Sequence, residues 1–241
     1  PNTNGFGVLL KYLESQGMNG KKVLVVSEFQ ATIPNLITQL VKSKPDWKDK
    51  MLRVDEPLWV NEDLALFNLD HRVSQLKKDS EDKSVDFVSL AFDEALFFFS
   101  SISSLSNQSI QKHFKANKFD SCVLLNAGQT PFALSLLPIA LTKKIVLVGD
   151  HFIGYPSVKD SVWKKEFEVR EEDLPIYRTS LFERLYTESL KRAEDGQRSI
   201  STSITVQNYT SQLMCKSSNE FFYSGLIQTE DSAKRLKLTE L

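Results

Sequence analysis

The chain has 241 residues, which is enough to bury a full hydrophobic core in one large domain or one and a half domains. Hydrophobic residues make up 41% and charged residues 25%, as in an ordinary globular protein, and a net charge of −1 excludes a general electrostatic attraction to nucleic acid or membranes. No apolar run approaches the roughly 18 residues of a membrane span, and no signal peptide is recognisable.

In the first half of the chain, short apolar runs alternate with segments of helical periodicity. Apolar side chains at helical spacing predict helices at residues 7–16 and 32–42. Short runs rich in valine and leucine predict strands at residues 22–26 and 51–54, and we expect a further strand at residues 86–90. Residues 61–85 are polar and charged, and the stretch LKKDSEDKS at residues 76–84 is predicted to be a solvated segment rather than core.

The second half continues this alternation. Predicted strands cover the aromatic run at residues 97–99, which ends in a serine-rich loop, and residues 122–125, 145–148 and 204–206. Predicted helices cover residues 108–114, the stretch between the strands at 122–125 and 145–148, and residues 180–193, which a polar linker follows. Repeated strand–helix units with buried strands predict an α/β fold, a parallel sheet with helices on both faces.

Three consecutive phenylalanines at residues 97–99 could in principle stack on nucleic-acid bases. In a buried strand they would instead pack on both faces of the sheet, and we favour this core position. Cys122 also lies in an apolar run, and we expect it to be a core thiol. Neither the two cysteines nor the three histidines have the spacing of metal ligands, so the sequence predicts no metal site.

Two strand ends carry the most informative residues. The strand at 122–125 ends in Asn126-Ala127-Gly128-Gln129, and the strand at 145–148 ends in Gly149-Asp150-His151. This strand–AGQ–helix–strand–GDH arrangement resembles motifs II and III of superfamily 1 helicases, in the branch of RNA/DNA helicases that includes Senataxin and Aquarius.

The resemblance extends along most of the chain. The segment PNTNGFG at residues 1–7 stands where the family has its phosphate loop, and residues 23–40 resemble the motif Ia unit, although Glu28 and Phe29 replace its small and polar residues. FFFSSISS, SLFERLY, VQNY and EFFYSGLI resemble further family segments in the same order. The resemblance implies a RecA-like fold of the P-loop NTPase type.

The resemblance also implies a domain organisation. Residues 1–193 correspond to a first RecA-like domain, and residues 194–241 to a linker with the start, or the remnant, of a second RecA-like half. Residues 61–85 would then be the stub of an insertion. The first residue is proline rather than methionine, so we expect the chain to be part of a longer protein.

The residues that carry ATP hydrolysis in the family are replaced here. Phosphoryl transfer requires a lysine on the phosphates, metal ligands and a residue that orients the attacking water. The lysine, hydroxyl, metal-binding aspartate, glutamate, γ-phosphate glutamine and arginine positions hold Phe6, Gly7, Leu125, Asn126, Ile153 and Tyr209, respectively. We therefore expect no catalytic residues, no cofactor and no ATPase activity.

Two functional classes follow from this reading. We expect an inactive helicase-like scaffold that binds a protein partner in a nuclear RNA-processing or RNA-silencing complex, with no membrane association. The alternative is an ATP-independent module for RNA or single-stranded DNA, with Lys143, Lys144, Lys164 and Lys165 as its candidate binding residues. An active ATPase that uses unorthodox residues is the third and least favoured reading.

Overall fold

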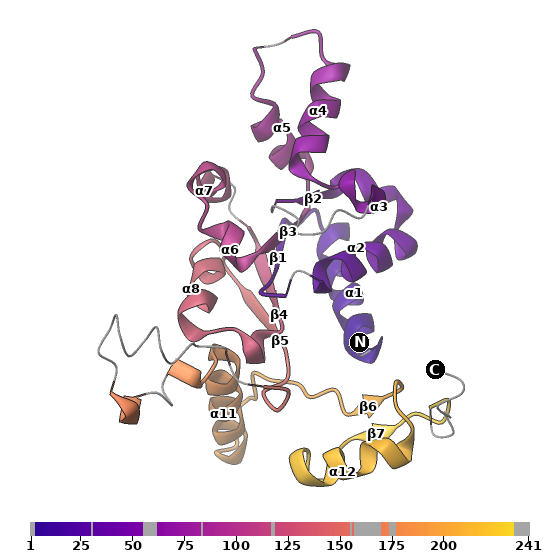
Figure 1. Ribbon diagram of the computed structural model, residues 1–241, viewed down its shortest axis with the longest axis vertical. Helices are drawn as coiled ribbons and strands as arrows, with labels where there is room; N and C mark the ends of the chain where they lie inside the picture. Colours follow the sequence, from indigo (N-terminus) through magenta and orange to yellow (C-terminus); the bar gives the residue numbers. More distant parts are fainter. Residues whose placement is uncertain are drawn as a thin grey trace. The chain divides into compact units, whose positions relative to one another are not determined.

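The computed structural model of the chain is shown in Figure 1. The structure describes residues 3–29, 31–54, 62–82, 84–116, 119–154, 156, 170–173 and 177–233. The chain divides into two compact units. The larger unit consists of Gln16–Thr187, and the smaller unit consists of Pro1–Ser15 together with Glu188–Leu241. Within the described ranges, no helix combines the length and the apolar character needed to cross a membrane.

The larger unit is built on a five-stranded sheet in the order β2-β3-β1-β4-β5, and all strands are parallel. The strands are β1 (Val23–Ser27), β2 (Met51–Arg53), β3 (Phe97–Ser101), β4 (Ser121–Leu125) and β5 (Ile145–Val148). Every residue of β1 to β4 is buried, because helices cover both faces of a parallel sheet, and only the edge strand β5 is partly accessible. The predicted α/β parallel sheet is confirmed, and it is consistent with a RecA-like fold.

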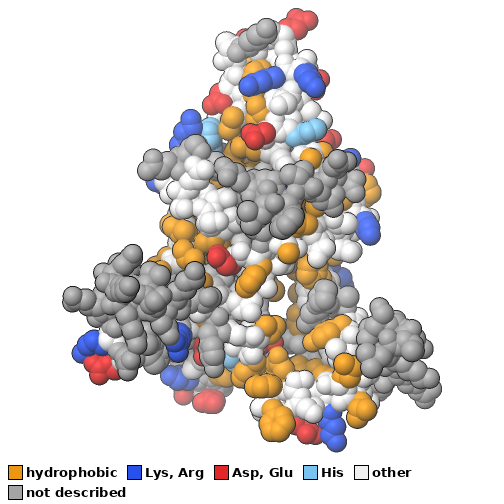
Figure 2. All heavy atoms as spheres, in the orientation of Figure 1, with side chains coloured by type: hydrophobic (Ala, Val, Ile, Leu, Met, Phe, Trp, Pro, Cys, Tyr) orange, Lys and Arg blue, Asp and Glu red, His pale blue; other side chains and the backbone are white. Residues whose placement is uncertain are grey.

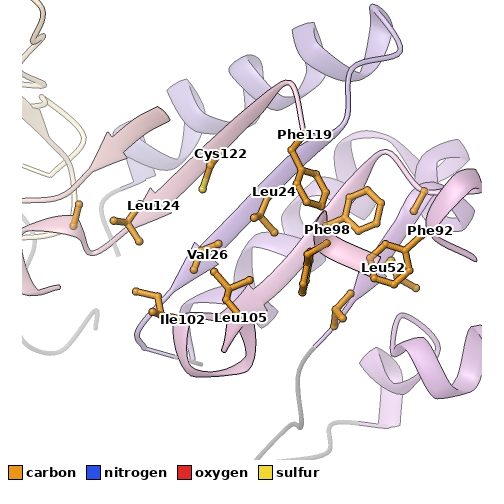
Figure 3. Close-up of a cluster of buried hydrophobic side chains, with 14 residues drawn as sticks. Leu24, Val26, Leu52, Phe92, Phe98, Ile102, Leu105, Phe119, Cys122 and Leu124 are labelled. Atoms are coloured by element: carbon orange, nitrogen blue, oxygen red, sulfur yellow. The ribbon is translucent and has the colours of Figure 1, made fainter. Parts of the chain in front are cut away.

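One face of the sheet carries the hydrophobic cluster in Figure 3. Phe98 lies at its centre, with ring centroids 5.3 Å from Phe92 and 5.0 Å from Phe119. The helices that contribute to this cluster are α5 (Phe87–Glu94), α6 (Ile102–Leu105), α7 (Gln108–Ala116) and α8 (Phe132–Ala140). The structure therefore confirms that the aromatic run at residues 97–99 belongs to the core.

The opposite face of the sheet is covered by α2 (Thr32–Ser43) and the 3-10 helix η1 (Pro45–Lys50), and Figure 1 shows α2 on the other side of the sheet from α6 and α8. α2 buries an apolar stripe at the predicted helical spacing, which consists of Ile33, Leu36, Ile37 and Leu40. Trp47 of η1 stacks on Phe97 of β3 with ring centroids 5.2 Å apart. Both faces of the strands are thus enclosed.

Some of the predicted elements differ from the structure. The strand predicted at residues 86–90 is wrong, because this segment begins α5. The Asp86 carboxylate accepts hydrogen bonds from the backbone N–H groups of Val88 and Ser89, which is the geometry of a helix N-cap. The serine-rich loop after β3 is likewise a short helix, α6, which Ser101 caps by accepting from the N–H of Ser104.

The polar segment at residues 61–85 contains α3 (Glu62–Ala65) and α4 (Leu69–Asp79). No residue of α4 is fully buried, in agreement with the solvated character predicted for residues 76–84, whereas Leu64 and Phe67 earlier in the segment are buried. α4 lies beside α5 (Figure 1), and Arg72 joins the two helices through an ion pair with Glu94 at 2.9 Å.

The Asp86 cap predicts a pH-dependent contribution to stability. Hydrogen bonds from Ser89 hold the pKa of the Asp86 carboxyl below its ordinary value. A folded-state pKa below the unfolded one means that the stabilisation is complete above the unfolded pKa of about 4 and is lost as pH falls through the folded pKa. Asp86→Ala is expected to be less stable than the wild type near neutral pH, and urea titrations should show this difference shrinking below about pH 4.

Asp86→Asn is the matched control, because an amide oxygen can still accept the backbone hydrogen bonds but does not titrate. A stability difference between Asp86→Ala and the wild type that stays constant down to acidic pH would contradict the capping role of the ionised carboxylate.

The smaller unit contains a strand–helix–strand element in which β6 (Val206–Gln207) pairs in parallel with β7 (Gln228–Thr229). α12 (Gln212–Phe222) connects the two strands. The strand predicted at residues 204–206 therefore exists but is shifted toward the C-terminus. α1 (Thr3–Met18) begins before the predicted start at residue 7, and α11 (Leu181–Glu194) agrees closely with the helix predicted at residues 180–193.

Candidate functional site

The carboxyl ends of the parallel strands share one edge of the sheet. The next strand in the chain after β1 is β2, which lies on one side of β1 in the sheet. The next strand after β3 is β4, which lies on the other side of β1. In α/β proteins, ligands bind at the carboxyl edge where the strand order reverses in this way. The candidate site therefore lies where β1 and β4 end, and it includes the loop after β5.

Asn126 follows β4 directly and joins three elements at this edge. Its side-chain oxygen accepts hydrogen bonds from Ser27 Oγ at 3.2 Å and from Thr32 Oγ1 at 3.1 Å. Ser27 is the last residue of β1, and Thr32 is the first residue of α2. Asn126 has a φ of 54°, in the left-handed region that asparagine tolerates better than most residues. The Asn126 side chain, which the motif resemblance assigns to the family's glutamate position, thus links β1, α2 and β4.

Leu125 stands where the motif resemblance places the family's metal-binding aspartate. Its side chain is buried at the end of β4, and it lies in register with Ser27 of β1 and Val148 of β5. An aliphatic side chain has no atom that could coordinate magnesium. Within the described ranges, no cluster of three or more histidine, cysteine or acidic side chains could hold a metal ion.

The loops after β4 and β5 pack backbone against backbone through Gly128 and Gly149. Gly128 lies in the 3-10 helix η2 (Ala127–Gln129). A Cβ atom on Gly128 would lie 2.8 Å from the carbonyl carbon of Asp150, and one on Gly149 would lie 2.7 Å from the backbone nitrogen of Gly128. Both distances are shorter than any normal contact of a Cβ atom. The loops after β4 and β5 are therefore in close backbone contact, and only glycine fits at either position.

The loop after β5 makes aromatic contacts with α11. The ring of His151 lies 4.0 Å from Phe152 and 5.0 Å from Tyr186, measured between centroids. The Asp150 carboxylate accepts a hydrogen bond from the N–H of Phe152 at 2.9 Å, which shapes the turn of this loop. Ile153, at the position of the γ-phosphate glutamine, is 69% exposed.

The remaining motif positions lie in the smaller unit. Phe6 and Gly7 are within α1, so residues 3–7 are helical where the resemblance places a phosphate loop. Tyr209 follows β6, and its N–H donates to the side-chain oxygen of the buried Gln207. Leu125, Asn126 and Ile153 are thus the motif positions that the larger unit contains.

The two candidate nucleic-acid lysines that the structure describes, Lys143 and Lys144, do not lie at the carboxyl edge. Lys143 and Lys144 directly precede β5, which places them at the amino edge of the sheet. Lys143 Nζ lies 3.6 Å from Asp120 Oδ1, and Lys21 Nζ lies 3.7 Å from the same oxygen. Asp120 therefore offsets part of the positive charge there. Lys164 and Lys165 lie outside the described residues.

Ser27 and Thr32 are the residues at this site that sequence reasoning missed. Each carries a hydroxyl at the end of a predicted element, which is a signal for capping or tethering. Nothing in the local sequence indicates that both hydroxyls meet the same amide oxygen.

Comparison with known proteins gives a partial similarity. No protein-family model matches the chain. A stretch of 53 residues is 43% identical to the DNA replication ATP-dependent helicase/nuclease dna2 of Schizosaccharomyces pombe. This stretch is 22% of the chain and 4% of that helicase/nuclease, so the chain matches only a small part of its length. The chain is thus similar to a helicase/nuclease over this stretch alone, which agrees with a parallel sheet that is consistent with a RecA-like fold.

The tether at Asn126 leads to a prediction about stability. Asn126→Ala removes both hydrogen bonds and leaves alanine in the left-handed region, and we expect it to lower the free energy of unfolding by about 2–3 kcal/mol. Asn126→Asp retains an acceptor oxygen, and we expect a loss below about 1 kcal/mol. Chemical denaturation measures both. Asn126→Gly also removes both hydrogen bonds but tolerates the left-handed backbone, so its difference from Asn126→Ala measures the backbone strain. An Asn126→Asp protein as unstable as Asn126→Gly would show that the acceptor oxygen contributes nothing.

Proposed function

We propose that the chain is a catalytically inactive helicase-like module that acts as a scaffold, binding a protein partner in a nuclear RNA-processing or RNA-silencing complex. The observation that carries the proposal is Asn126, an amide whose oxygen is bound by two hydroxyl groups at the position of the family's catalytic glutamate. The RNA-related and nuclear setting comes from the motif resemblance to the Senataxin/Aquarius-type branch.

The chemistry of the carboxyl edge supports the loss of ATP hydrolysis. Hydrolysis needs magnesium on the β- and γ-phosphates and a group that orients the attacking water. Leu125 provides no metal ligand, and a neutral amide such as Asn126 is not a base at physiological pH. The intact packing around these residues indicates that the fold is maintained without that chemistry, as expected of a protein used for its surface.

A second candidate function is ATP-independent binding of RNA or single-stranded DNA. Lys143 and Lys144 are exposed, and the partial similarity is to a protein of DNA replication. The net charge of −1 and the ion pair between Lys143 and Asp120 favour the protein scaffold, because binding to phosphates is driven by basic surfaces.

The first test is magnesium-dependent ATP turnover by the purified chain, with and without RNA or single-stranded DNA. We expect no turnover above the background of a mock purification and no thermal stabilisation by ATP. Turnover that disappears in Asp150→Asn, which keeps an acceptor oxygen for the N–H of Phe152, would overturn the proposal, because it would show that the carboxyl edge is catalytic.

The second test separates the scaffold from the nucleic-acid module. The tagged chain is used to capture binding partners from nuclear extract with and without RNase, and each captured protein is then purified and tested for direct binding. The scaffold predicts a protein partner that survives RNase and binds directly. RNA affinity that falls steeply with salt, together with partners lost on RNase treatment, would favour the nucleic-acid module instead.

A further inference from the structure

In the smaller unit, α12 has three exposed large apolar side chains on the side of the helix opposite Asn219. Asn219 fixes the rotation of the helix, because its side-chain nitrogen donates to the carbonyl of Ile227 and its side-chain oxygen accepts from the N–H of Ile227, both at 2.8 Å. Ser211 caps the helix by accepting from the N–H of Met214. The polar side of α12 therefore faces the segment that leads into β7.

The outward side of α12 carries an apolar stripe. Successive residues of an α-helix are about 100° apart, so Ser217 lies on the opposite side from Asn219, and Leu213 and Phe221 lie one turn before and after it. Leu213 is 82% exposed, Phe221 is 84% exposed and Met214, beside them, is 59% exposed. Figure 2 shows hydrophobic side chains gathered on the surface of this part of the chain. We call Leu213, Met214, Ser217 and Phe221 the α12 stripe.

Exposed apolar side chains are unremarkable when single, but a contiguous group on one helix face marks an interface. The two hydrogen bonds of Asn219 prevent the helix from turning the stripe inward. A large apolar side chain buries roughly 150–250 Å², so these three exposed side chains can supply on the order of 400 Å². A standard interface buries about 800 Å² on each partner, so the three side chains would supply about half of this area. An area of this size is suited to the apolar centre of an interface.

We propose that the α12 stripe is a self-association surface on which a second copy of the chain docks through its own α12, in antiparallel orientation. A two-fold axis at Ser217 brings Leu213 of each copy opposite Phe221 of the other. The small Ser217 side chains then face each other, which allows the helices to approach closely at their crossing point. The stripe carries no charge, so an identical apolar face is a chemically matched partner.

The charges beside the stripe favour the antiparallel arrangement. Lys216 and Glu220 lie on the same flank of α12, one turn apart, and both are exposed. In an antiparallel pair, equivalent flanks face each other with reversed direction, so Lys216 of one copy lies near Glu220 of the second copy. The two-fold symmetry generates this pair twice, so the Lys216 side chain of each copy lies near the Glu220 carboxylate of the other.

Cysteine cross-linking tests the two-fold axis directly. The background variant is Cys215→Ser, because Cys122 is fully buried and unavailable to oxidants. Ser217→Cys in this background, oxidised with copper phenanthroline in air, is expected to form a covalent dimer, since the axis places the two thiols within disulfide reach. Gln212→Cys is the matched control: it is exposed on the same helix but points away from the stripe, and we expect it to form no covalent dimer.

Sedimentation equilibrium of the unmodified chain provides the second readout. We expect a concentration-dependent dimer that Leu213→Glu or Phe221→Glu weakens by roughly thirtyfold or more, as for loss of an interface hot spot. Circular dichroism should be unchanged, because these side chains are exposed. Lys216→Glu should also weaken the dimer, and the exchange Lys216→Glu with Glu220→Lys should restore it.

Three outcomes would overturn the proposal. The first is a monomer at all concentrations together with no cross-link at residue 217. The second is a dimer that is insensitive to both glutamate substitutions. The third is equal cross-linking of Ser217→Cys and Gln212→Cys. Each readout is independent of ATP turnover and of partner capture, so failure of this proposal and failure of the scaffold function are distinguishable.

Discussion

Phe98→Ala is expected to lower the free energy of unfolding by about 4 kcal/mol, as measured by urea denaturation. The Phe98 side chain is fully buried in β3, between Phe92 of α5 and Phe119 before β4. Truncation leaves a cavity that rings held by the strand and the helix cannot fill, so the lost contacts add to the lost burial. Loss on this scale is a large part of the stability of an ordinary domain.

Phe29→Ala is the control for this prediction, because the Phe29 side chain is 44% exposed in the loop after β1. We expect it to change the free energy of unfolding by less than about 0.5–1 kcal/mol. Equal effects of the two substitutions would show that the aromatic cluster around Phe98 is not the centre of the core.

The second large effect is expected at Gly128. Gly128→Ala places a methyl group against the backbone of Asp150, where neither loop can retreat without separating the ends of β4 and β5. We expect a loss of about 3 kcal/mol, at the upper end of the cost of overpacking. Differential scanning calorimetry should show a lowered melting temperature.

Gly154→Ala is the matched control, since its added methyl group would meet only the end of the flexible Gln129 side chain, at 3.4 Å. Its effect should stay below about 1 kcal/mol. A Gly128→Ala protein as stable as Gly154→Ala would contradict the close packing of the loops after β4 and β5.

Much of the sheet could be predicted because its strands are continuous apolar runs. A strand buried on both faces needs apolar residues at nearly every position, and residues 23–26, 97–99 and 122–125 show this directly. The segment at residues 86–90 was mispredicted for a local reason. Its apolar residues fit both the two-residue period of a strand and the 3.6-residue period of a helix. The hydrogen bonds that Asp86 accepts from Val88 and Ser89 favour the helix.

The residues of the candidate site could be named from the sequence, but the residues that they contact could not. The motif resemblance assigns Leu125 and Asn126 to two acidic positions of the family, and this assignment needs only the order of residues in the chain. The partners of Asn126 cannot be assigned in this way, because Thr32 and Ser27 are 94 and 99 positions away in the chain. Only the pairing of β1 with β4 brings them to the same edge.

The sequence by itself determined the α/β class of the fold and the absence of acidic side chains at positions 125 and 126, since both depend on residue type and periodicity. The tertiary structure decided which edge of the sheet each residue occupies: Asn126 lies at the carboxyl edge, whereas Lys143 precedes β5 at the amino edge. It also decided that the α12 stripe faces outward. These placements depend on strand order and on hydrogen bonds such as those of Asn219, neither of which local sequence encodes.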